Sequence, residues 1–149
     1  MVRKLMAEIA DIATAMVDAL NGHTFPMAFT ATREYAPLAD LKDMGVLHVT
    51  VVPSGIELLP LARHLAQDDV TVDVAIQQKL KTMDVAESDV LMAMVELIGD
   101  YIRQRGTFAP GQWLGATNLP IYSQEHMREM RVFTSVISVT LRVHKQWPG

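Results

Sequence analysis

The sequence contains no cysteine among its 149 residues. Disulfides, thiolate nucleophiles and cysteine-based zinc sites are therefore excluded. Charged residues make up only 20% of the chain and aromatic residues 6%. The 13 Lys and Arg residues against 17 Asp and Glu residues give a net charge of −4. Because like charges never form a long run, the sequence offers no basic patch for non-specific binding to nucleic acid.

Long hydrophobic runs are also missing. Glu8 and Asp11 interrupt the apolar N-terminal region, which therefore does not match a signal peptide. The uncharged stretch from Thr107 to Gln124 contains prolines and glycines that would break a helix. We expect a loop there, with no membrane-spanning segment and no membrane partner.

Motifs that carry catalysis are absent as well. The sequence has no Gly-x-Ser-x-Gly elbow, no phosphate-binding Gly-x-x-x-x-Gly-Lys loop and no His-Glu-x-x-His pair. We therefore predict that the protein is not an enzyme and has no catalytic, cofactor-binding or metal-binding residues. A small α+β enzyme stays open as an alternative, if a pocket gathers two or more of His48, His64, Arg33 and Arg142 with nearby carboxylates.

Half of the residues are hydrophobic, and they recur along the chain with clear periodicity. Apolar steps of three and four predict amphipathic helices over residues 3–21 and 84–105. Gly22 should end the first helix in a left-handed conformation. For the second helix, Asp84 is the expected N-cap with Glu87 as its capping-box partner, and Gly106 is the expected stop.

Alternating apolar residues predict strands over residues 25–35, 46–52, 70–80 and 132–144. The resulting order, α-β-β-β-α-β, predicts a single domain over residues 1–149. Its class is α+β, a two-layer sandwich in which two helices cover a mostly antiparallel four-stranded sheet. The expected core face of the last strand consists of Phe133, Ser135, Ile137, Val139, Leu141 and Val143.

Two segments lack a clean period, residues 54–69 and residues 107–124. For the first, two interpretations remain open: a long connection whose exposed leucines contact a partner, or a short buried helix across a sheet edge. The second segment is predicted to be a loop. Both segments are candidates for the surfaces of a subunit interface.

Candidate interface residues are large side chains in these segments and at strand ends. Trp113 either packs in its own core, which we favour, or anchors in a partner, whereas for Trp147 we favour a partner. The full set of interface candidates is Arg33, Tyr35, Ile56, Leu59, Arg63, Trp113, Tyr122 and Trp147.

Five segments together resemble a family of small phage proteins, the tail terminators or tail completion proteins. Their sequences are FTATREYxPxxDL from Phe29 to Leu41, VxVVP from Val49 to Pro53, VDVxIQxK from Val72 to Lys79, IYSxEH from Ile121 to His126, and RxFTSV from Arg131 to Val136. The order and spacing of these segments carry the resemblance.

The resemblance implies a structural virion protein that forms a ring, commonly a hexamer, at the head-proximal end of the tail. Such a ring ends growth of the tail tube and joins the tail to the head connector, so the implied partners are further copies of the chain, the tail tube protein and a connector or neck protein. The implied location is the virion, and the host cytoplasm during assembly. A head-completion or neck protein of the same junction is the alternative.

The family also implies that DNA passes through the ring without sequence-specific binding. The acidic segment over residues 84–100 contains no Lys or Arg, and an acidic lumen would let DNA slide because like charges repel. Glu87, Asp89 and Glu96 are the lumen candidates. A plain solvated helix face explains the same charges and is the favoured interpretation.

Overall fold

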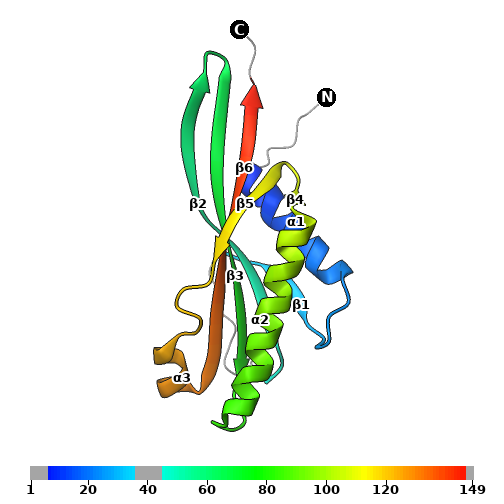
Figure 1. Cartoon of the computed structure of the whole chain (residues 1–149), viewed down its shortest axis with the longest axis vertical. Coiled ribbons are helices and arrows are strands. Elements are labelled where there is room, and N and C mark those ends of the chain that lie inside the picture. Colours follow the sequence, from blue (N-terminus) through cyan, green and yellow to red (C-terminus); the bar gives the residue numbers. More distant parts are fainter. Residues whose placement is uncertain (1–6, 36–44, 147–149) are drawn as a thin grey trace.

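The computed structural model describes residues 7–35 and 45–146 of the chain. Its elements in sequence order are α1 (Glu8–Gly22), β1 (Thr30–Arg33), β2 (His48–Ala62), β3 (Leu65–Lys79), α2 (Val85–Arg105), β4 (Thr107–Phe108), β5 (Gly111–Thr117), α3 (Gln124–Met130) and β6 (Val132–Gln146). Figure 1 shows an elongated molecule in which α1 and α2 lie against the long, twisted sheet.

The sheet has six strands in the order β1-β2-β3-β6-β5-β4 and curls into a half-barrel. β1 runs parallel to β2, and the other neighbouring strands are antiparallel. β6 is the last strand in the sequence but lies in the middle of the sheet, between β3 and β5. The inner strands β3 and β6 are each 15 residues long, so they form the spine of the molecule.

The core fills the curled face of the sheet. On this face Val72 lies opposite Val139 and Val74 lies opposite Ile137. Ile12 and Met16 of α1 and Ile98 of α2 are fully buried against the sheet. The predicted core face of the last strand is confirmed, because Phe133, Ser135, Ile137, Val139, Leu141 and Val143 are all buried.

The predicted fold class is wrong. In place of a four-stranded, mostly antiparallel sheet covered by two helices, the described residues form a six-stranded mixed sheet with three helices. The two additional strands, β4 and β5, come from residues 107–124, which were expected to form a loop. The third helix, α3, lies in the polar stretch before β6, and the side chain of Ser123 caps it by accepting from the His126 amide at 3.3 Å.

Residues 54–69 form neither a long connection nor a buried helix. They continue β2 and β3 as an antiparallel hairpin that closes through the two residues Arg63 and His64. The register between the two strands shifts at Pro53/Gly55 and again at Pro60/Ala62. Each shift changes which residues share a face, so the alternating pattern that marks a strand is interrupted twice.

The predicted strand over residues 25–35 is largely irregular. Only Thr30–Arg33 pairs with β2, as strand β1. The alternating Phe25 and Phe29 belong instead to an aromatic cluster, in which the His23 ring stacks on Tyr101 of α2 with centroids 4.2 Å apart. The Tyr101 hydroxyl donates to the Ala19 carbonyl at 3.1 Å, so the cluster links the end of α1 to α2.

The helix ends differ in part from the predicted caps. Gly106 adopts the left-handed conformation that ends α2, as predicted, with φ of 71°. Gly22 does not, because it still belongs to α1 and His23 caps that helix in an extended conformation. Asp84 is the N-cap of α2 without a side-chain cap bond, and Glu87 instead accepts from the amides of Lys81 and Thr82. Within the described residues, none of the helices combines the length and the apolar character needed to cross a membrane.

Candidate subunit interface

The far end of the β2–β3 hairpin projects beyond both helices, together with the end of β6 (Figure 1). We call this projection the blade, and it consists of residues 55–68 and 143–146. Its tip is the two-residue turn at Arg63 and His64, where His64 has a φ of 68°. Both tip side chains are exposed, so the blade ends in a cation.

The blade carries large apolar side chains that the described part of the chain does not cover. Leu58 is 70% exposed and Leu61 is 54% exposed, and the predicted candidate Ile56 is 46% exposed. Leu59, also a predicted candidate, is half-buried. An apolar hairpin in water favours association, because each leucine gains free energy when a partner removes it from solvent.

The two edges of the blade are open. β1 pairs with β2 only over His48–Val51, so among the described strands nothing pairs with the outer edge of β2 along the blade. On the other side, β5 pairs with β6 only as far as Arg142, which leaves the end of β6 with β3 as its one described neighbour. Such edges present free amide and carbonyl groups to a partner.

A charged cluster fixes the base of the blade to α1. Lys145 Nζ lies 2.8 Å from Asp68 Oδ2 and 3.4 Å from Glu8 Oε2 of α1. Burial and the hydrogen bond with Asp68 raise the pKa of the Glu8 carboxyl, whereas the hydrogen bond from Lys145 lowers the pKa of Asp68. The two carboxyls therefore share the cation unequally, with the pKa of Asp68 shifted down and the pKa of Glu8 shifted up.

The outer face of the sheet beside the blade is polar and internally paired. Arg142 donates through both Nε and Nη2 to the Asp69 carboxylate, at 2.9 and 3.2 Å, directly across the β3–β6 pair. This hydrogen bonding lowers the pKa of Asp69. Two residue pairs further along the same face, the Ser138 hydroxyl donates to the Asp73 carboxylate at 2.7 Å. These groups already satisfy one another, so the apolar blade is the better candidate for a contact surface.

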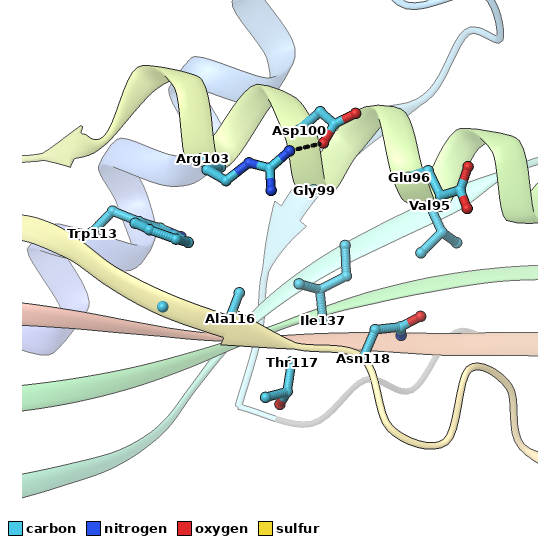
Figure 2. Close-up of a pocket in the computed structure, with 11 residues that line it drawn as sticks. Val95, Glu96, Gly99, Asp100, Arg103, Trp113, Ala116, Thr117, Asn118 and Ile137 are labelled. Carbon is cyan, nitrogen blue, oxygen red and sulfur yellow. Dashed lines mark hydrogen bonds and ion pairs between the residues drawn. The ribbon is translucent and has the colours of Figure 1, made fainter.

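A second candidate surface is the groove between α2 and β5, with a volume of about 560 Å³ (Figure 2). Its floor is apolar, with Val95 and Ile137 between the helix and the sheet. Trp113, a predicted candidate, lines one end of the groove and is partly buried against the core. Glu96 and Asp100 stand along the helix side, where Arg103 pairs with Asp100 at 2.6 Å.

The remaining predicted interface residues are scattered. Arg33 and Tyr35 lie just at the end of β1, where the Arg33 guanidinium stacks over the Tyr35 ring at 5.3 Å and Tyr35 is 72% exposed. Tyr122 is half-buried and packs against the core near α3. Trp147 lies outside the described residues. The structure thus brings Ile56, Leu59 and Arg63 together on the blade and keeps the others apart.

Exposed leucines in residues 54–69 were one of the two interpretations of that segment, but Leu58 and Leu61 were not among the named interface candidates, and the groove was not predicted. The available signal was an apolar segment without a period, which shows that its leucines have no single buried face. Among the acidic candidates, Asp89 and Glu96 are exposed on α2, whereas Glu87 is half-buried and bound by two backbone amides.

The side chains named for the enzymatic alternative do not meet in the groove. His64 is at the blade tip, Arg142 is paired with Asp69, and neither Arg33 nor His48 lines the groove. Within residues 7–35 and 45–146, no three His, Asp or Glu side chains are grouped so that they could hold a metal ion.

Comparison with known proteins places the fold. No protein-family model and no curated protein matches the sequence. Among solved structures, the chain is similar to a chain in the virion of a native gene transfer agent particle, with a TM-score of 0.50 and 10% sequence identity. The similarity covers 91% of this chain and 93% of that chain, so the two share their fold over almost their whole length.

Proposed function

We propose that this protein is a structural component of a phage-like virion that assembles into a ring, commonly of six copies, at the head-proximal end of the tail. There it would end growth of the tail tube and join the tail to the head connector. The observation that carries the proposal is the blade, a projecting hairpin whose leucines are exposed in the single chain.

The shared fold gives the proposal its context. The similar chain belongs to a virion particle, and the shared fold covers 91% of this chain and 93% of that chain. The resemblance of five sequence segments to tail terminators leads to the same class of protein.

A ring also needs two different surfaces on each copy that meet head to tail. The blade and the α2–β5 groove are two such surfaces, one projecting and one hollow. In such a ring the exposed Asp89 of α2 remains a candidate for the lumen, where it would repel DNA rather than hold it.

The test is the mass of the protein in solution, alone and with purified tail tubes. We expect a closed oligomer by native mass spectrometry, and tube ends capped by a ring in electron micrographs. A protein that stays monomeric across concentrations and leaves tube ends bare would overturn the proposal.

A second experiment separates this role from the head-completion or neck role. Immobilised protein is offered tail tube protein and portal protein in parallel. Retention of the tail tube protein supports the tail role, whereas retention of portal protein alone assigns the chain to the head side of the junction.

A further inference from the structure

The groove between α2 and β5 is lined by a residue whose hydrogen-bond donor lacks an acceptor. The indole Nε1 of Trp113 is buried, and it has no acceptor among the described residues. A buried donor without an acceptor costs free energy, which an entering group with a carbonyl or hydroxyl oxygen would recover once the indole ring turns Nε1 toward the groove. The groove floor beside it is apolar and open to solvent (Figure 2). The groove is therefore suited to an occupant that supplies both apolar side chains and an acceptor.

The charge of the groove narrows the choice of occupant. Glu96 and Asp100 both stand on its helix side, and Arg103 neutralises Asp100. No ion pair engages Glu96 in the described part of the chain, so the groove keeps one uncompensated negative charge on its rim. An occupant with a cation at the matching position gains electrostatic complementarity.

The blade tip has the complementary chemistry. Leu58 and Leu61 are exposed near its end, the tip residue Arg63 is an exposed cation, and the two turn residues take no part in the pairing between β2 and β3. The tip and the groove lie at different heights of the molecule and on different elements, β2–β3 against α2–β5 (Figure 1). The two surfaces can therefore meet between two copies of the chain.

We propose that the blade tip of one copy inserts into the α2–β5 groove of the next copy. Its leucines lie on the floor at Ile137, and Arg63 pairs with Glu96. The contact joins two unlike surfaces, so its repetition gives a ring when the rotation between successive copies closes, as the proposed function requires, and an open filament when it does not. This inference rests on the proposed ring function, and it assigns Glu96 to a subunit contact rather than to the lumen.

The absence of native cysteine makes the contact directly measurable, because any introduced thiols are the only ones present. The double variant Arg63→Cys with Glu96→Cys is treated with a short bismaleimide cross-linker and run on denaturing gels. A cross-linker is needed because two long side chains that form an ion pair hold their Cβ atoms too far apart for a direct disulfide. We expect a ladder of linked chains that ends at the size of the ring. A mixture of the two single variants should yield linked dimers and nothing longer.

The matched control pairs Arg63→Cys with Asp18→Cys, which places the second thiol on an exposed position of α1. It should give at least about tenfold less cross-linked product. Equal cross-linking of the control pair overturns the inference, because it indicates random collisions.

Charge reversal provides a second test of the proposed contact. Arg63→Glu and Glu96→Arg should each weaken self-association about tenfold, and the combination should restore it if the two side chains face each other.

Rings that form without cross-links and are unaffected by either charge reversal overturn the inference but leave the proposed function intact. A wild-type protein that never self-associates overturns the proposed function itself. If rings form without cross-links while Glu96→Arg blocks binding to the tail tube, the groove belongs to another protein and the inference is again overturned.

Discussion

Gly111 of β5 lies so close to Ile12 of α1 that an added Cβ would stand 3.0 Å from Ile12 Cδ1. The same Cβ would come within 3.1 Å of the Leu141 Cβ, an atom that cannot move without the β6 backbone. The first helix therefore packs onto β5 so closely that a Cβ at position 111 requires Ile12 or Leu141 to shift by a few tenths of an ångström.

Gly111→Ala should consequently lower the free energy of unfolding by about 1–3 kcal/mol, the usual cost of overpacking a filled core. The matched control is Gly115→Ala on the same strand, where nothing lies within 4 Å of the added Cβ. Urea unfolding of both variants provides the measurement. If the two variants are equally stable, the close contact between α1 and β5 is wrong.

Replacement of Val139 by Asp should unfold the domain. Val139 is fully buried in the middle of the sheet, opposite Val72. An unpaired carboxylate there has no partner, and the expected loss is at least about 4 kcal/mol. Thr117→Asp, an exposed position on β5, should change stability by less than about 0.5 kcal/mol. Circular dichroism during heating distinguishes the two results.

The blade leucines should matter for assembly and not for folding. Leu58→Lys combined with Leu61→Lys removes exposed apolar surface at positions 70% and 54% accessible. The melting temperature should stay within a few degrees, because exposed substitutions shift stability little. The oligomer should dissociate at concentrations at which the wild type remains assembled. Val85→Lys makes the same kind of exchange on α2, at 75% exposure, and should leave assembly unchanged.

Glu8 should make stability depend on pH. Its pKa in the folded protein is raised by burial and by the hydrogen bond with Asp68, so the folded state favours the protonated carboxyl. The stability that Glu8 contributes through this preference is fully present below the unfolded pKa near 4.5 and is lost as the pH rises through the folded pKa. Glu8→Gln keeps a hydrogen-bond donor at all pH values, so its stability relative to wild type should increase with pH across this window.

The opposite shift at Asp68 does not disturb this comparison. Its lowered pKa contributes stability above the unfolded value near 3.8, which is lost as the pH falls through the folded value, and both proteins retain that group. The measurement is urea unfolding at about pH 4 and about pH 7.5. A difference between variant and wild type that is equal at both pH values would contradict the assignment. Glu125→Gln on the exposed side of α3 is the control.

Sequence periodicity predicted those elements that have one buried face. β6 alternates between buried and less buried residues along most of its length, and α2 has a buried stripe that includes Met94 and Ile98. In both cases the core imposes a regular pattern, and the pattern is visible without coordinates. The same reasoning explains why the core face of β6 was predicted correctly although the fold class was not.

The blade and β5 could not be predicted in this way, for two different physical reasons. The blade has solvent near both faces, so burial imposes no period on its sequence. Its two register shifts also interrupt the alternation of side chains between the two faces of the strand. β5 is short and contains two glycines, of which Gly111 faces the close approach of α1, and glycine is also the usual mark of a loop. The groove depends on how α2 lies over β5, which is a tertiary relationship that no local pattern encodes.

The central position of β6 has a consequence for how the protein is made. β6 follows every other described element in the sequence, yet both β3 and β5 need it as their neighbour. While the ribosome is still adding residues 132–146, the two halves of the sheet have no strand to join them, and the hydrophobic face of α2 lacks a strand on which it packs. Folding of this core must therefore wait until translation has passed β6, and nascent chains that stop earlier should be substrates for chaperones and proteases.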